Sequence, residues 1–424
     1  MSYARTVEID GHIIDSGTMQ RCFGAVMDLG GSFDVEAFDV GTHEEAESYC
    51  RMTVSADDEA TLQAIVHELH QNGAVLEDPS DVTLVAAPAD KVVPPDFYST
   101  TNHPTEVLYD GEWIDVERIE MDCALIVEPD GDPSGGPRAA TKVLDAVEEG
   151  DLVATDESGI RVNPPERPRG TSGAFGFMQG GVSSERPSES TIREVAAELH
   201  RVKASGGSVM VVPGPAVIHS GAGEALADLV AAGYVDALSA GNGFATHDLE
   251  RSLYGTSLGM DVETLEHPRK GHKHHIWTIS EIIRAGGIEA AVEQGLITEG
   301  VMYECVEHDV STVLAGSIRD DGPLPDTITD AVEAQDAIRD QAHEADIVLM
   351  LATLLHSVAV GNCLPSTTKT VCVDINPATV TQLLDRGSAQ AVGMVTDIGT
   401  FVPTLAEFVL DGDGDPVAEV GEDR

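Results

Sequence analysis

The chain has 424 residues, a length that suggests two or three domains and allows a sizeable core. It carries 74 acidic residues against 24 basic ones, a formal net charge of -50, and hydrophobic residues make up 42% of it. Hydrophobic periodicity persists throughout, which excludes a disordered acidic protein, and the surplus of negative charge excludes a surface built to bind nucleic acid phosphates.

The acidic residues are spread over the whole sequence, and only six of the basic residues are lysines. This pattern is typical of a folded protein that stays soluble at high salt, so we predict a salt-accumulating cytoplasm. The alternative is an acidic surface for a basic partner. That alternative predicts clustered charge, whereas the charge here is diffuse.

The six cysteines form no C-x-x-C pair, and several of them lie in apolar runs. They are typical of reduced, mostly buried thiols in a cytoplasmic protein. The sequence shows no signal peptide and no apolar run close to the roughly 20 residues that span a bilayer. We therefore expect a cytoplasmic protein that does not enter a membrane.

Residues 1–92 predict a ferredoxin-like α+β domain, because strands and helices follow one another in the order β-α-β-β-α-β. The expected elements are strand 5–9, helix 16–29, strands 32–40 and 48–54, a helix ending at residue 70, and a last strand at 82–86. Nothing in this region is catalytic in type. A scaffolding or oligomerisation role is therefore favoured, and the binding of a small regulator is the alternative.

Residues 93–170 predict a small β-rich module between two proline-containing breaks. Apolar runs at 106–109, 113–116 and 124–127 predict strands, and residues 152–154 and 159–162 predict a hairpin. A brief helix is expected at 141–147.

Residues 171–424 predict a Rossmann-like α/β domain. Strands and helices alternate here, which favours a parallel sheet covered by helices on both faces. The expected strands are 208–212, one starting at 237, 347–351, 371–375 and 391–395, and the expected helices are 221–232, 280–285, 288–294, one within 325–345, 377–386 and 401–410.

The segment 345–377 contains two of these strands, separated by a polar break that contains a glycine. The second strand run includes Asp374, and an acidic residue at the carboxyl end of a parallel strand is where dinucleotide-binding sheets hold a ribose. Thr353, His356 and Asn362 follow the first strand, where open α/β sheets bind ligands. These residues leave two readings open: a nicotinamide cofactor site, or an ordinary α/β core without a ligand.

Other strand ends add to the cofactor reading, although the sequence lacks a complete G-x-G-x-x-G. Residues 221–223 (GAG) precede a helix, so their amides are candidates for facing a pyrophosphate. Asn242 and Gly243 follow a strand, and Thr396 and Asp397 follow another. Small or polar residues at four strand ends of one sheet favour a shared cofactor site.

The sequence TTNHPT at 100–105 is a dense polar cluster. His103 is a candidate general acid or base. The alternative is a loop held by Asn and Thr side-chain turns. Asp122 is suited to hold a substrate ammonium group or, alternatively, to pair with an arginine, and Cys123 and Cys305 lack the neighbouring sequence that marks a nucleophile.

The sequence GHKHH at 271–275 raises the question of a metal, with His267 nearby. Zinc takes three or four ligands, and no cysteine stands at a recognisable spacing from these histidines. We therefore predict no metal, and we expect Lys273 to contact a carboxylate or a phosphate. His219 and His247 lie near glycine-rich strand ends and are candidate neighbours of a cofactor or substrate.

Eight longer blocks of sequence carry a family resemblance. They are DFYSTTNHPT (96–105), IEMDC (119–123), GPAVIHSGA (214–222), GNGFATHDLE (241–250), GTSLG (255–259), GHKHH (271–275), LATLLHSVAVGN (351–362) and VDINP (373–377). Through them essentially the whole chain resembles the archaeal-type ornithine cyclodeaminases, also described as the lysine-ketoglutarate reductase/saccharopine dehydrogenase (LOR/SDH) conserved region. The same region forms the C-terminal half of bifunctional cyanobacterial arginine dihydrolase/ornithine cyclodeaminases. Their guanidine-hydrolysing domain has no counterpart here, so that activity is not implied.

The resemblance implies an enzyme that converts L-ornithine to L-proline and ammonia with tightly bound, recycled NAD. Ring closure by the δ-amine is helped by proximity, and the site must orient ornithine, shuttle protons and exclude water. We also expect a homo-oligomer. The candidate substrate residues, assigned by chemical type, are Asn102, His103, Asp122 and Lys273, and the candidate cofactor residues are Asn242, Gly243, Thr353, Leu354, Leu355, His356, Asp374, Asn376 and Asp397.

Two other functions remain open at this point. One is a dehydrogenase of the saccharopine or lysine type, which would accumulate NADH, whereas a cyclodeaminase produces none in net terms. The other is a non-catalytic regulator that binds NAD or an amino acid and releases no ammonia.

Overall fold

The computed structural model describes residues 3–14, 16–43, 46–77, 79–131, 136–164, 188–261, 273–320, 322–386 and 391–411. The chain forms two compact units. The first comprises Met1–Thr171 together with Pro365–Thr367, and the second comprises Ser172–Leu364 and Thr368–Arg424. The domain boundaries predicted after residues 92 and 170 stay predictions.

The first sheet of the first unit has the ferredoxin-like strand order β2-β3-β1-β4. Its central strand β3 alternates between buried and half-buried residues, since the apolar side chains on one face pack under the two helices. The elements are β1 (Tyr3–Gly11), α1 (Thr18–Asp28), β2 (Ser32–Asp39), β3 (Ser48–Ala56), α2 (Glu59–Gln71) and β4 (Val75–Leu76).

The last strand of this domain differs from the prediction. The fourth strand is the two-residue β4, whereas β5 (Thr83–Ala86) pairs antiparallel with β10 (Leu152–Thr155) in the next sheet. The prediction at 82–86 named a strand correctly but assigned it to the wrong sheet. Its apolar run fits either sheet, and only the long-range pairing with β10 decides between them.

The second sheet of the first unit has the order β11-β6-β7-β9-β8-β10-β5. The predicted hairpin at 152–162 is wrong, because β10 pairs with β5 and β8 while β11 pairs with β6. Residues predicted as a helix at 141–147 instead end a strand and form one short 3-10 turn, η1. The remaining elements are β6 (Thr105–Tyr109), β7 (Glu112–Glu117), β8 (Ala124–Glu128), β9 (Arg138–Lys142), η1 (Leu144–Ala146) and β11 (Ile160–Val162).

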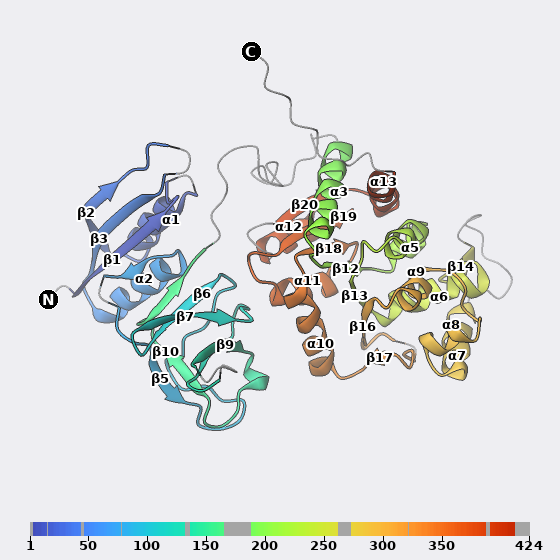
Figure 1. Ribbon diagram of the computed structural model, residues 1–424, viewed down its shortest axis with the longest axis horizontal. Coiled ribbons are helices and arrows are strands. Elements are labelled where there is room, and N and C mark those ends of the chain that lie inside the picture. The colour runs from blue at the N-terminus through green and yellow to red at the C-terminus, as the bar shows by residue number, and fades with distance from the viewer. Residues whose placement is uncertain are drawn as a thin grey trace, which may run out of the picture. The chain divides into compact units, whose positions relative to one another are not determined.

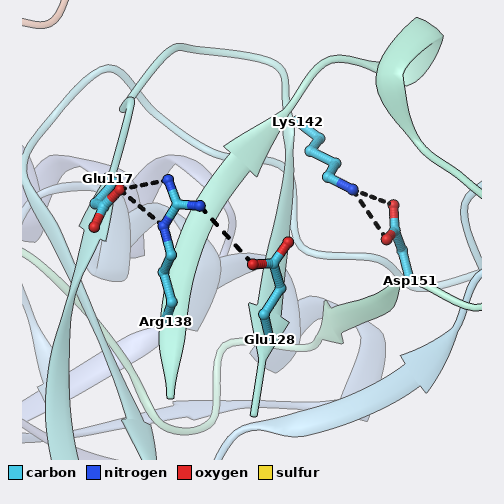
Figure 2. Close-up of polar contacts among 5 residues, drawn as sticks. All are labelled: Glu117, Glu128, Arg138, Lys142 and Asp151. Atoms are coloured by element: carbon cyan, nitrogen blue, oxygen red, sulfur yellow. Dashed lines mark hydrogen bonds and ion pairs between the residues drawn. The ribbon is translucent and has the colours of Figure 1, made fainter. Parts of the chain in front are cut away.

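Ion pairs on this sheet show how the scarce basic residues are used. Figure 2 shows Arg138 between two carboxylates, with its Nη2 2.6 Å from Glu117 and its Nη1 3.9 Å from Glu128. Lys142 Nζ lies 2.8 Å from Asp151. Such partly exposed pairs contribute little to stability individually, because water and salt screen them. They leave the large acidic surplus of the chain uncompensated.

The second unit is built around a seven-stranded parallel sheet with the order β17-β16-β13-β12-β18-β19-β20. In sequence order, β12, β13, β16 and β17 follow one another toward one edge of the sheet. The strands β18, β19 and β20 follow one another toward the other edge. This is the doubly wound order of dinucleotide-binding folds, with the topological switch point between β12 and β18. The predicted Rossmann-like fold is confirmed.

The elements of the second unit follow in sequence. They are α3 (Ser188–Ala204), β12 (Val209–Pro213), α4 (Ala216–His219), α5 (Gly223–Ala231), β13 (Ala237–Gly241), α6 (Asn242–Tyr254), β14 (Thr256–Ser257), β15 (Met260–Asp261), α7 (His274–Ala285), α8 (Ile288–Glu293), α9 (Val301–Glu307), β16 (Ser311–Ala315), β17 (Thr327–Ile328), α10 (Ala331–Glu344), β18 (Ile347–Leu351), α11 (Leu355–Cys363), β19 (Lys369–Asp374), α12 (Pro377–Arg386), β20 (Ala391–Val395) and α13 (Ile398–Leu410).

Helices cover both faces of this sheet (Figure 1). Along β12, Val209 and Val211 belong to the core under α3, α5 and α13, while Met210 and Val212 belong to the core under α10, α11 and α12. Alternate residues of one strand therefore enter two different cores. That explains why the central strands read as continuous apolar runs.

Two simpler expectations concern the whole chain. All six cysteines are buried and none of them forms a disulfide, in agreement with the prediction of mostly buried, reduced thiols. Within the described residues, no helix has the length and apolar character required to cross a membrane.

Candidate functional site at the carboxyl edge of the parallel sheet

The backbones of β12 and β18 come together just beyond the switch point. The amide of Gly214 donates to the carbonyl of Leu351 at 2.8 Å. A Cβ atom on Gly214 would lie 2.2 Å from the carbonyl oxygen of Ala352, so only glycine fits. Ala352 itself has a φ of 51°, which is uncommon for a residue with a side chain. This junction shapes the carboxyl edge where doubly wound sheets bind ligands.

The β18–β19 side of this edge has the features of a cofactor seat. The helix α11 begins four residues after β18 ends, and Asp374 is the last residue of β19. Asp374 is half-buried, and its Oδ1 accepts the amide of Asn376 at 2.7 Å. Leu355 and Ile375 are 73% and 70% exposed, an unusual state for large apolar side chains. An acidic strand end beside exposed apolar residues fits a ribose and an adenine ring, so these residues fit NAD.

The remaining predicted cofactor residues on this side lie along the same edge. Thr353 and Leu354 occupy the turn between β18 and α11, with Leu354 41% exposed. Asn376 is exposed, and its Oδ1 accepts the amide of Ala378 at the start of α12. Asp397 is exposed at the start of α13, next to Thr396, whose amide donates to the carbonyl of Asp374.

On the β13 side, Gly241 lies under the ring of His356. A Cβ atom on Gly241 would lie 2.6 Å from His356 Nε2, so the absence of a side chain makes room for the imidazole. Burial lowers the pKa of His356. His356, at the start of α11, therefore places its ring against the end of β13. A residue that contacts a cofactor bound across both strand ends would occupy such a position.

Asn242 and Gly243 start α6 directly after β13. The Oδ1 of Asn242 accepts the amide of Leu324 at 2.9 Å and the hydroxyl of Thr327 at 3.1 Å. That oxygen is therefore committed to holding the chain ahead of β17. A cofactor contact through Asn242 stays a prediction, now limited to its amide nitrogen and its backbone.

A cluster of histidines lies beyond the ends of β12 and β13. The rings of His219 and His247 have centroids 4.7 Å apart, and those of His247 and His275 are 5.2 Å apart. His219 is the last residue of α4, His247 lies in the second turn of α6, and His275 lies in the first turn of α7. Three short stretches that are distant in sequence thus form one histidine column.

The carboxylate of Glu250 is fully buried and contacts this column at His247. Its Oε1 accepts the Thr256 hydroxyl and the Gly259 amide, both at 2.8 Å, and its Oε2 accepts the Leu258 amide at 3.2 Å. His247 Nδ1 lies 3.5 Å from Oε2. Burial alone would raise the pKa of Glu250, but the contacts from His247, Gly259 and Thr256 outweigh it and hold that pKa below its usual value.

Hydroxyl groups of β14 fix two further histidine rings. Ser257 Oγ lies 2.7 Å from His219 Nδ1, and Thr256 Oγ1 lies 2.8 Å from His274 Nδ1. Burial, followed by the nearby His247, lowers the pKa of His219 to about 4. His219 is therefore neutral at physiological pH and acts there as a hydrogen-bonding group.

The cluster also has the composition of a metal site. Ligand atoms of His247, Glu250 and His275 all lie within 4.8 Å of one another. Both oxygens of Glu250, however, already accept hydrogen bonds from the β14–β15 turn. A carboxylate with its lone pairs so engaged is better suited to orient an imidazole than to bind a metal ion. The absence of a metal stays a prediction.

In the first unit, Asn102, His103 and Asp122 lie on two loops that are hydrogen-bonded to each other. Thr100 joins the loops: its amide and hydroxyl bond to Cys123, and its carbonyl accepts the amide of Asp122 at 2.9 Å. Asn102 is buried, whereas Asp122 is exposed and has a φ of 60°. The structure therefore brings these three predicted residues together.

His103 is held by a segment from far along the chain. Its Nδ1 lies 2.8 Å from Ser366 Oγ, and the Ser366 amide donates to the Asn102 carbonyl at 2.7 Å. Ser366 belongs to the short segment of the first unit that comes between α11 and β19 in sequence. Burial lowers the pKa of His103, which keeps the ring neutral at physiological pH.

Lys273 belongs to the second unit and is exposed at the start of α7, next to His274 and His275. The other residues of the GHKHH prediction, Gly271 and His272, lie outside the described residues, as does His267. Sequence reasoning missed Glu250, Thr256 and Ser257. The available signal was the spacing of His247 and Glu250 in THDLE, since residues three apart share one face of a helix.

Family models match almost the whole chain. The conserved region of LOR/SDH bifunctional enzymes matches residues 4–103. Two models of ArgZ-like arginine dihydrolases follow: the first region of the C-terminal part matches 104–192, and its Rossmann fold matches 193–405.

Named relatives agree with these models. The ornithine cyclodeaminase of Methanothermobacter thermautotrophicus is 49% identical over 97% of this chain and 99% of its own length. The crystal structure of apo ArgZ, a cyanobacterial arginine dihydrolase, has a TM-score of 0.83 and 38% identity over 97% of this chain and 59% of that one.

A third relative has been solved with ligands. The ternary complex of AgrE with ornithine and NAD+ is 42% identical over 97% of this chain and 59% of that one, with a TM-score of 0.52. AgrE is the name of a bifunctional arginine dihydrolase/ornithine cyclodeaminase of Nostoc sp.. Together with the doubly wound sheet and its acidic strand end, these similarities show that the chain belongs to the family of archaeal ornithine cyclodeaminases and their cyanobacterial, ArgZ-like counterparts.

Proposed function

We propose that this protein is an NAD-dependent ornithine cyclodeaminase that converts L-ornithine to L-proline and ammonia. One observation carries the proposal: identity of 49% extends over 97% of the chain to a relative named ornithine cyclodeaminase. Support comes from the AgrE complex, which holds both ornithine and NAD+. The edge of the second unit supplies a fitting cofactor seat, as described above.

The bound NAD would supply reversible oxidation at the ornithine α-carbon. The residues that would hold it are Asp374 at the ribose and Leu355 and Ile375 at the adenine, with the amides at the start of α11 near the pyrophosphate. His356 would close the edge over Gly241. The chain's own task is to orient ornithine, to exclude water and to move protons.

Four residues are proposed to contact ornithine, and each is assigned within its own unit. Asn102, His103 and Asp122 are candidates on the loops of the first unit, and Lys273 is the candidate on the second. A carboxylate such as Asp122 suits an ammonium group, and a lysine suits the amino-acid carboxylate. Each assignment rests on chemical type and on placement within its own unit.

The physiological setting is part of the proposal. We infer a role in proline biosynthesis, a homo-oligomeric enzyme and a salt-rich cytoplasm. The net charge of -50 supports high salt, since uniform negative charge destabilises a compact state unless counterions screen it. The melting temperature should rise steeply with potassium chloride. Full stability in dilute buffer would contradict the salt assignment.

The direct test of the activity is incubation of the purified protein with ornithine and NAD at high salt. Proline and ammonia should appear in equal amounts, without NADH. Accumulation of NADH would instead identify a dehydrogenase. Binding of NAD without release of ammonia would identify a regulator.

A further inference from the structure

We propose that His247 is the residue that transfers protons to and from the α-nitrogen of the substrate, with Glu250 as its positioning residue. This inference rests on the proposed function and adds to it the group that does the acid–base chemistry. The histidine column of His219, His247 and His275 would form the wall against which the reacting end of ornithine lies.

The topology places this column at the reacting end of a dinucleotide. In doubly wound sheets a dinucleotide spans the switch point, with one half on each side. The β18–β19 side carries the acidic ribose position, Asp374, so the nicotinamide half belongs over β12 and β13. The helices that follow those two strands, α4 and α6, are the ones that carry His219 and His247.

The burial of His247 distinguishes it from an ordinary surface histidine. The residue is 6% exposed, and its Nδ1 has no hydrogen-bond partner among the described residues apart from the 3.5 Å contact with Glu250. Because Nδ1 faces Glu250, Nε2 points away from that carboxylate. A carboxylate behind one nitrogen stabilises the protonated ring while the other nitrogen exchanges the proton.

Glu250 is built to stay ionised at this position. It is fully buried, yet three donors satisfy its oxygens: the Thr256 hydroxyl of β14 and two amides of the turn between β14 and β15. Leu258 and Gly259 supply two of them because the turn has φ values of 52° and 70°, which directs both amides inward. A buried charge requires such a network, and here the network leaves the remaining interaction of Oε2 for His247.

The groups that face His247 from the surrounding helices are Glu250, His219 and His275. His219 is neutral at physiological pH because burial lowers its pKa to about 4, so it does not compete for the proton. Among the residues that the structure describes, Glu250 is the one carboxylate in contact with His247. We assign the proton to His247 because it contacts a carboxylate, whereas His219 is neutral.

His247 accounts for the proton that leaves the α-nitrogen and later returns to it. His247 Nε2 accepts a proton from the α-ammonium of ornithine; the N–H bond breaks, and the nitrogen keeps the electron pair. Later the imidazolium returns that proton to the same nitrogen as its bond to the α-carbon breaks, and the nitrogen leaves as ammonia. The δ-nitrogen separately loses one proton before it bonds to the α-carbon and a second after that bond forms. It regains one of these protons in proline, and the released ammonia takes up the other, so the overall conversion of ornithine to proline and ammonium exchanges no net proton.

The test compares His247→Gln, Glu250→Gln and Glu250→Asp with the wild type at high salt. His247→Gln should lower kcat about 100-fold or more, the scale of general acid–base catalysis, while the Kd for NAD stays within about twofold. Glu250→Gln should move the acid limb of the kcat/KM profile to lower pH, because the imidazolium loses its counter-charge. Glu250→Asp keeps the charge and should retain more activity than Glu250→Gln.

The matched control is His308→Gln. His308 forms a His–Glu pair with Glu304 at 3.2 Å on α9, but it is exposed. This variant should turn over ornithine like the wild type. It controls for the loss of a histidine from an ion pair elsewhere in the same unit.

Three results would overturn the inference. Wild-type kcat in His247→Gln would remove the histidine from the chemistry. If His247→Gln and Glu250→Asp both lost NAD binding as well as activity, the role of the pair would be structural. One equivalent of divalent metal per chain, with activity lost on chelation, would make His247 and Glu250 metal ligands. A wild type that produces no proline would instead refute the proposed function itself.

Discussion

The two sides of the switch point in the parallel sheet are built differently. On the β18–β19 side, large apolar side chains are exposed around one acidic strand end, as with Leu355 and Ile375 beside Asp374. On the β12–β13 side, polar groups are buried: Glu250 is inaccessible and His247 nearly so. One side offers an open surface for a ligand, and the other encloses a hydrogen-bonded network.

We infer from this difference that one side binds the cofactor and the other carries the chemistry. An open apolar surface gains free energy when a planar ring covers it. Burying a carboxylate–imidazole pair costs free energy of desolvation, and such pairs are found where a protein transfers a proton. Variants on the first side should therefore change Kd, and variants on the second side should change kcat.

The largest effect is expected where the two sides meet. Gly214→Ala would place a Cβ atom 2.2 Å from the carbonyl oxygen of Ala352, and a backbone carbonyl cannot move aside cheaply. We expect a loss of about 1–3 kcal/mol of unfolding free energy, as for other overpacked sites. NAD binding should be lost as well. Chemical denaturation and calorimetric titration would measure the two effects.

Gly361→Ala is the control for this variant. A Cβ atom there would lie 3.7 Å from Met350 Cε, an ordinary contact, and the position is within α11. Stability and NAD affinity should stay close to wild type. If Gly214→Ala bound NAD as tightly as this control, the switch point would not be the cofactor seat.

The next effect tests the open side alone. Asp374→Ala removes the proposed acceptor for the ribose hydroxyls, and hydrogen bonds to charged groups contribute about 1.5–3 kcal/mol. The Kd for NAD should therefore rise about 10- to 100-fold, with kcat at saturating NAD nearly unchanged. Asp228→Ala, an exposed position on α5, is the control. Equal affinities in the two variants would remove Asp374 from the site.

A smaller effect would show whether the first unit takes part in the chemistry without binding NAD. His103→Ala removes a half-buried ring held by Ser366 at 2.8 Å. If His103 serves substrate chemistry, kcat should fall about tenfold or more while NAD affinity stays at the wild-type value. Wild-type turnover would show that the ring only holds its loop in place.

The smallest effect concerns the pH dependence of stability that arises from His219 on the β12–β13 side. Burial lowers the pKa of His219 to about 4, whereas in the unfolded chain it is about 6.5. The unfolded state therefore binds more protons below pH 6.5, and stability falls as the pH drops from there towards 4. His219→Gln should reduce the loss of stability between pH 8 and pH 5 by about 1 kcal/mol, measured by denaturant titration. An unchanged pH profile would contradict the enclosure of this ring.

The fold class was predictable because its signals are local. The apolar run at Ile347–Leu351 and the acidic end at Asp374 identify strands and an edge without knowledge of their partners. The sheet assignment of Thr83–Ala86 was not, since pairing with β10 joins residues about 70 positions apart. Helix α6 was missed because its buried face carries His247, Asp248 and Glu250, so apolar periodicity is weak.

The site was predictable in part for the same reason. Strand-end residues such as Asp374 and His356 are identified by their position after apolar runs. Glu250 carries no such mark, because its role depends on amides of a turn nine residues later. Charged residues inside a buried helix therefore deserve consideration as functional candidates whenever their spacing places them next to a histidine.

The most direct test of the account follows the hydrogen on the ornithine α-carbon. The purified enzyme is given α-deuterated ornithine and unlabelled NAD at high salt, and the proline is analysed by mass spectrometry. Internal, redox-neutral cyclodeamination predicts proline that keeps the deuterium at its α-carbon, an equal amount of ammonia and no accumulated NADH. Proline without deuterium, or NADH in proportion to the substrate consumed, would contradict it.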